Sequence, residues 1–199
     1  MKTKTKALAL ALCAVLLVVS TVFVTMAYLT STTDVVTNTF TYGQVTITLD
    51  EAKVDVYGKE ITGEDRVTEN SYKLIPGHEY TKDPSVHIDK ASEDCYVFVR
   101  VVNGISGIEK DTTVAQQMET NGWTPLSGVG NVWYYNTIVT PDDTNGADLP
   151  VFGTFTIKDD ANVSAYDDKF ITVQAYAVQA DGFDSAADAW AAAPTKWTE

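Results

Sequence analysis

The sequence is poor in the residue types that most often build metal sites and covalent cross-links, with 2 cysteines and 2 histidines among 199 residues. Cys13 lies inside an N-terminal apolar run, so Cys95 has no partner for a disulfide in the rest of the chain. Stability must therefore come from packing. Because Cys95 precedes an apolar strand pattern, we expect a small buried side chain there rather than a reactive thiol.

Cationic residues are also scarce. Lysine and arginine number 14 against 27 aspartate and glutamate residues, and Lys2, Lys4 and Lys6 lie at the N-terminus. Without these three lysines the balance is 11 against 27, a net charge of −16. Such a surface repels phosphate backbones, so nucleic acid is not an expected partner. It also favours solubility.

Only one stretch of the sequence is long and apolar. Residues 7–27 carry no charge, follow the three lysines and end on the small residue Ala27, which is the layout of a secretory signal. We expect a helical signal peptide over residues 1–27, cleaved between Ala27 and Tyr28, so that membrane contact ends with cleavage. The alternative is an uncleaved anchor, because about 20 apolar residues suffice to span a bilayer.

The remainder is dominated by strand patterns. Residues 45–49 alternate apolar and polar side chains, and residues 96–102 are apolar on both faces except for Arg100, which favours a central strand. Pro76 and Gly77 predict a type II turn. We expect strands or extended segments at residues 40–42, 45–49, 54–56, 72–75, 85–88, 96–102, 132–135, 138–139, 151–157 and 170–178.

Two short segments have helix signals. Asp111 or Thr112 is a possible cap for a helix that runs through Glu119, with Asn121-Gly122 as its stop signal. Asp184 or Ser185 is a possible cap for a helix at residues 186–193. The sequence therefore predicts an all-β domain, a jelly roll or β-sandwich with two or three short peripheral helices. Its divisions are a signal peptide (1–27), an extended segment (28–40) and one domain (41–199).

Residues with catalytic chemistry form no recognisable motif. A metal site built from His78, Glu79, His87 and Asp89 is conceivable, but without a ligand-spacing pattern we expect turn or surface histidines. The acidic loop 141–146 lacks EF-hand spacing and is expected to be a solvated turn. Trp133 and Tyr135 would be buried together, and Trp190 would plug one end of the sandwich. We therefore expect no catalytic residue, no metal and no cofactor.

The junction after the apolar run resembles that of the TasA/camelysin family. Residues 25–30 carry its specialised signal-peptide ending, and residues 36–51 follow its N-x-F-x-x-G-x-V-x-I-x-L strand. Further similarity covers nearly the whole chain, at residues 74–77, 82–86, 96–101 and 176–180 together with the C-terminal helix.

The resemblance implies a secreted jelly-roll subunit of an extracellular biofilm matrix fibre in a Gram-positive bacterium. Its expected partners are a signal peptidase of the endoplasmic-reticulum type and neighbouring copies of the chain. Residues 28–40 would be added as a strand to the next subunit, an arrangement that satisfies exposed sheet edges. Tyr28, Leu29, Val35, Val36 and Phe40 would anchor that strand. The alternatives are a flexible lead-in, a camelysin-like surface metallopeptidase, and a monomeric cell-surface or spore-surface component.

Overall fold

The computed structural model describes residues 12–13 and 44–193. The chain divides into two compact units, Met1–Thr41 and Tyr42–Glu199. In the first unit Leu12 and Cys13 are helical, and the remaining residues of the expected signal peptide, its cleavage site and the 28–40 segment lie outside the described residues. In the described part, no helix has both the length and the apolar character needed to cross a membrane.

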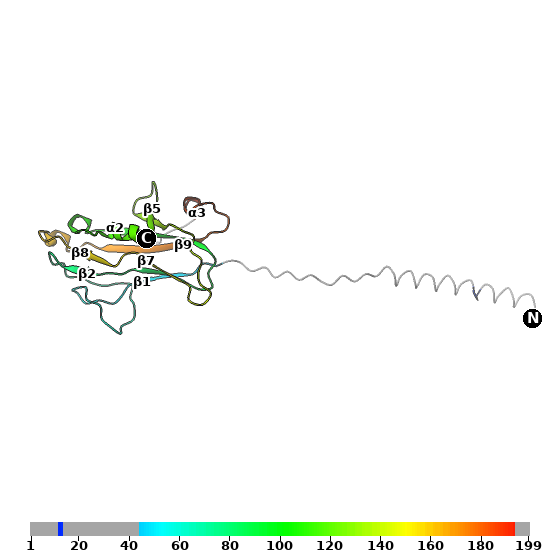
Figure 1. Cartoon of the computed structure of the whole chain (residues 1–199), viewed down its shortest axis with the longest axis horizontal. Coiled ribbons are helices and arrows are strands. Elements are labelled where there is room, and N and C mark those ends of the chain that lie inside the picture. Colours follow the sequence, from blue (N-terminus) through cyan, green and yellow to red (C-terminus); the bar gives the residue numbers. More distant parts are fainter. Residues whose placement is uncertain (1–11, 14–43, 194–199) are drawn as a thin grey trace, which may run out of the picture. The chain divides into compact units, whose positions relative to one another are not determined.

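The second unit is an all-β domain with two short α-helices among its described residues (Figure 1). Its strands form three antiparallel sheets. The first sheet has the order β1-β3-β7, with β1 at Ile47–Asp50, β3 at Ser85–Ile88 and β7 at Ala147–Pro150. The second pairs β2 (Glu79–Thr81) with β8 (Thr154–Thr156). The third has the order β5-β6-β4-β9, with β5 at Trp123–Pro125, β6 at Val132–Tyr135, β4 at Cys95–Asn103 and β9 at Ile171–Gln179.

Strand β4 is the centre of the four-stranded sheet, as its apolar sequence predicts. It pairs with β6 on one side and with β9 on the other. Its side chains alternate between two apolar environments. Val97 and Val99 enter the main core shared with Val86 of β3, whereas Phe98 points to the opposite face. A strand apolar on both faces is stable only where both faces are covered.

The two helices begin at residues close to those expected. Thr113, not Asp111 or Thr112, caps α2 (Val114–Thr120) through a capping box with Gln116. The reason is Glu109, a buried carboxylate that accepts a 2.7 Å hydrogen bond from the backbone N–H of Val114 and fixes the helix start one residue later. Burial raises the pKa of Glu109 even though this bond opposes the rise.

Helix α3 (Ala186–Ala192) is capped by Ser185, whose Oγ accepts from the backbone N–H of Asp188 at 3.2 Å. Ala189 is fully buried and Trp190 packs against Phe98, with ring centroids 5.1 Å apart. Trp190 therefore packs on the outer face of the four-stranded sheet, and α3 lies near one end of the domain (Figure 1).

Several expected strands are shorter or absent. Val54 forms only an isolated bridge to Glu60, because residues 55–58 turn the chain. Residues 72–75 are not paired in a ladder, residues 138–139 form one bridge to Cys95, and residues 151–157 contain only the three-residue β8. The turn at Pro76-Gly77 is confirmed, since Gly77 has φ +77° and His78 N–H donates to Ile75 O at 3.2 Å.

Candidate functional site: an open seam and a polar network

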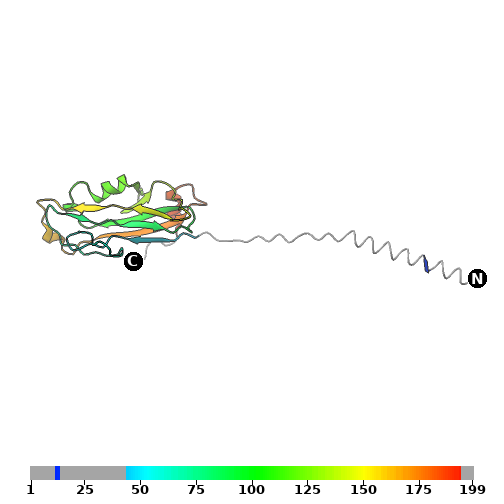
Figure 2. The same ribbon diagram turned by 60° about the horizontal axis from the view of Figure 1, so that its bottom comes forward.

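Strands β1 and β9 are both sheet edges and lie beside one another (Figure 2). Cα atoms of the two strands approach within 8 Å. In the described part of the chain β1 pairs only with β3, and β9 pairs only with β4. One edge from each sheet therefore faces the other without a ladder between them. We call this place the open seam, and define it by β1 and β9.

The core is incompletely covered along the open seam. The core-facing residues of β9 include Val173, Ala175 and Ala177, and each is only half-buried. Their partners on β4, from Val97 to Val101, are buried. With Ile171, four residues of β9 pack against the main core, and two of the four are alanines, whose side chains are small. The open seam thus combines unpaired edge backbone with core-facing side chains that are only partly buried, and both features make an edge strand receptive to another strand.

Strand β1 has the same character on its side of the seam. Ile47 and Leu49 face the core and are half-buried, while their cross-strand partners Ile88 and Val86 are almost fully buried. Apolar side chains at this edge retain contact with water that a further strand would remove.

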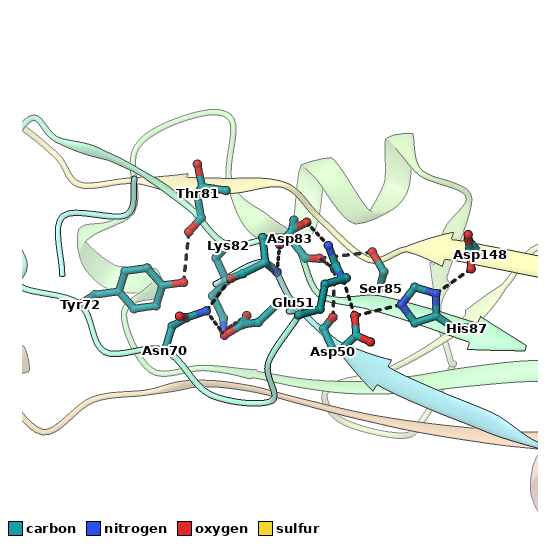
Figure 3. Close-up of polar contacts among 12 residues, drawn as sticks. Asp50, Glu51, Asn70, Tyr72, Thr81, Lys82, Asp83, Ser85, His87 and Asp148 are labelled. Atoms are coloured by element: carbon teal, nitrogen blue, oxygen red, sulfur yellow. Dashed lines mark hydrogen bonds and ion pairs between the residues drawn. The ribbon is translucent and has the colours of Figure 1, made fainter. Parts of the chain in front are cut away.

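A polar network lies at the end of β1, where the chain leaves the sheet for residues 51–82 (Figure 3). The Glu51 carboxylate is 2.6 Å from Lys82 Nζ, and the two side chains are 5% and 11% exposed. Asn70 Nδ2 donates to the other Glu51 oxygen at 3.0 Å and to Ala52 O at 2.8 Å. A buried ion pair requires such satisfied neighbours, because desolvation otherwise exceeds the attraction. The network therefore joins Glu51 and Lys82, the first and last residues of the segment 51–82.

Arg66, within the segment 51–82, binds the two residues that flank this segment. Its guanidinium contacts the carboxylates of Asp50 and Asp83 and also donates to the backbone carbonyls of both residues. Asp83 in turn accepts from Ala52 N–H at 2.7 Å. Partial burial opposes ionisation of Asp50, but hydrogen bonds from Arg66 and His87 outweigh it and lower the pKa of that carboxyl.

His87 lies on the outer face of the three-stranded sheet, between two carboxylates (Figure 3). Its Nδ1 is 2.6 Å from Asp148 Oδ1 on β7, and its Nε2 is 3.0 Å from Asp50 Oδ1 on β1. Partial burial alone would lower the pKa of His87, but the bonds to Asp148 and Asp50 raise it above its ordinary value. The imidazole therefore connects all three strands of the sheet.

The residues of the conceivable metal site are not brought together as one group. His78 Nε2 lies 2.8 Å from Tyr57 O, and His87 is engaged by the two aspartates. Within residues 12–13 and 44–193 no cluster of three or more histidine, cysteine, aspartate or glutamate side chains could hold a metal ion.

The loop 141–146 is a turn in which Asp142 Oδ1 accepts from the backbone N–H groups of Thr144 and Asn145.

The burial of single side chains tests the predictions for Cys95, Trp133 and Tyr135. Cys95 is fully buried, and burial raises the pKa of its thiol to about 11, as expected for an unreactive side chain. Trp133 and Tyr135 both contact the main core, as expected, but stay half-buried. Ala27, Tyr28, Leu29, Val35, Val36 and Phe40 lie outside the described residues.

The polar network is what sequence reasoning missed. Lys82 and Asp83 lie beside Pro84 in a segment whose sequence assigns them no partner. Glu51 and Lys82 are 31 positions apart, so neither helical nor strand spacing connects them.

Comparisons with known proteins find no similarity to this chain: no protein-family model, no curated protein and no solved structure matches it.

Proposed function

We propose that this chain is a secreted structural subunit with a jelly-roll domain, which assembles into fibres by adding the processed N-terminal segment of one copy to the next. The proposal combines the resemblance of the signal junction to the TasA/camelysin family with one structural observation. That observation is the open seam, where two unpaired strand edges and half-buried core residues lie together.

Strand addition has a physical basis at this seam. An added strand would pair with β9, β1 or both, and so satisfy edge N–H and C=O groups. Inserted strands are spaced about 4.8 Å from each neighbour, so two flanking strands must stand about 10 Å apart. The Cα atoms of β1 and β9 now approach within 8 Å. Insertion therefore requires a modest outward movement of β1 or β9.

The segment 28–40 has suitable side chains for this role. Successive residues of a strand face opposite sides, so Val36 and Phe40 share one face, and Val35 lies on the other with threonines. Val36 and Phe40 would pack against the half-buried side chains of Ala175 and Ala177. A head-to-tail contact of this kind is heterologous and need not close, so it propagates as a filament.

The proposal is tested by secreting two forms of the full chain from a Gram-positive host and examining them by negative-stain electron microscopy. One form is unaltered, and the other lacks residues 31–40 but keeps the cleavage junction. We expect filaments from the first and monomers from the second. Filaments from both, or from neither under any condition tried, would contradict assembly through this segment. Chelator-sensitive peptide cleavage by the unaltered chain would instead favour the metallopeptidase alternative.

A matched pair of point variants locates the acceptor. Ala175→Lys places a charge at the core side of the open seam, whereas Gln174→Lys places the same charge on the other face of β9. Inward charges on edge strands block strand addition. We expect A175K to abolish filaments and Q174K to retain them, with thermal unfolding confirming that both variants are folded. Equal assembly of the two variants would exclude the seam as acceptor.

A further inference from the structure

The position of His87 has a consequence that is independent of the proposed function. Each of its two ring nitrogens lies within hydrogen-bond distance of a carboxylate oxygen, 2.6 Å to Asp148 and 3.0 Å to Asp50. A neutral imidazole carries one N–H donor and one acceptor lone pair. An ionised carboxylate only accepts, so a neutral ring satisfies one of these contacts and opposes the other. Both contacts at once require the imidazolium form.

The surroundings favour that form. The ring is held on the central strand β3 and is faced by Asp50 from β1 and Asp148 from β7. The remaining charged groups at this site are Arg66, which binds Asp50, and Asp83, which shares Arg66. Asp148 is 74% exposed and has no other ion-pair partner among the described residues, whereas Asp50 keeps Arg66 when His87 changes state.

We propose that His87 is a proton-operated latch that fastens β1 and β7 to β3 when its ring is charged and releases one of them when the ring is neutral. The contact released is the one between His87 and Asp148, because the exposed Asp148 carboxylate can turn to solvent, and the backbone ladder between β3 and β7 remains. The latch acts on the outer face of the sheet, opposite the core contacts of Val86 and Leu149. Its opening loosens the sheet edge without unfolding the core.

The direction of the pH effect follows from linkage. The pKa of His87 is higher in the folded chain than its ordinary value of 6.5, so the latch contributes its full stabilisation below that value. The contribution is lost as the pH rises through the folded pKa. At the acid end, the lowered pKa of Asp50 keeps that contact until the pH falls below the ordinary aspartate range.

The chain offers a direct test, because His78 and His87 are its two histidines. The imidazole ¹⁵N and ¹H resonances of the full chain are titrated by NMR between pH 5 and 9, with assignments from His78→Gln and His87→Gln. We expect His87 to show two protonated ring nitrogens at pH 6 and to titrate above 6.5. His78, which meets a backbone carbonyl instead of carboxylates, serves as the internal control.

Asp148→Asn supplies the second readout. Because Asp148 is exposed, the variant is expected to fold, and removing one carboxylate should lower the pKa of His87. Amide exchange of residues 147–150, corrected for its intrinsic pH dependence, should accelerate above the folded pKa in the unaltered chain. We expect about a tenfold change for each pH unit by which that pKa exceeds 6.5. In H87Q this dependence should vanish. A neutral His87 at pH 6.5, or a titration unaffected by D148N, would overturn the latch.

Discussion

The three-stranded and four-stranded sheets cover the same core, but different kinds of interaction stabilise their outer faces. On the outer face of β1-β3-β7, the side chains of Asp50, His87 and Asp148 form a chain of charged hydrogen bonds. On the outer face of β5-β6-β4-β9, Phe98 and its neighbours are covered by helix α3. The first arrangement depends on pH and salt, whereas apolar burial does not. The comparison predicts that the two sheets respond to different perturbations.

The largest expected effect comes from the apolar side. Phe98→Ala removes a fully buried ring that contacts Trp190 and should lower the free energy of unfolding by about 3–5 kcal/mol, with no dependence on salt. Phe170→Ala is the matched control, since Phe170 is 71% exposed and its loss should cost less than about 0.5 kcal/mol. Denaturant unfolding at low and high salt measures both. Equal losses would mean that α3 does not seal this face.

Breaking the buried ion pair should have the next largest effect. Lys82→Met leaves the Glu51 carboxylate buried with Asn70 as its remaining partner, and should cost about 3 kcal/mol. Adding Glu51→Gln removes the unpaired charge and keeps an acceptor for Asn70. The double variant should therefore recover at least about 1 kcal/mol relative to K82M, measured by the same unfolding experiment. If the double variant is less stable than K82M, burial of an unpaired charge is not the cause of the loss.

The smallest effect in the set concerns the cap of the helix that covers the four-stranded sheet. Ser185→Ala removes the acceptor for Asp188 N–H and should cost about 1 kcal/mol, which corresponds to roughly 2–4 °C in the unfolding midpoint. Ser164→Ala changes an exposed serine outside any α-helix and serves as control. Calorimetry distinguishes the two. Comparable midpoints would show that α3 forms without its cap.

Local patterns predicted the parts of the fold that local forces decide. Strand β4 follows from seven consecutive residues that suit a doubly covered strand, and the cap at Ser185 follows from its side chain. Strands β2, β5 and β7 escaped prediction because they are three or four residues long and include charged residues or proline. Their pairing with distant strands supplies the stability that their own sequence lacks.

The candidate site was predictable to a smaller degree. The expected signal junction directs attention to residues 28–40, but no pattern in residues 171–179 predicts that β9 lies at an edge or that β1 lies beside it. Edge position is a property of topology. The same holds for His87, whose two aspartate partners are 37 and 61 positions away.

Hydrogen exchange of β9 in the monomer and in the assembled state tests the central claim most directly. We predict that those amides of Ile171–Gln179 whose N–H groups point away from β4 become strongly protected on assembly, because an added strand pairs with this open edge. The amides of β6, an interior strand of the same sheet, should change little. Unchanged exchange of β9 in filaments, or equal protection in the chain that lacks residues 31–40, would contradict strand addition at the open seam.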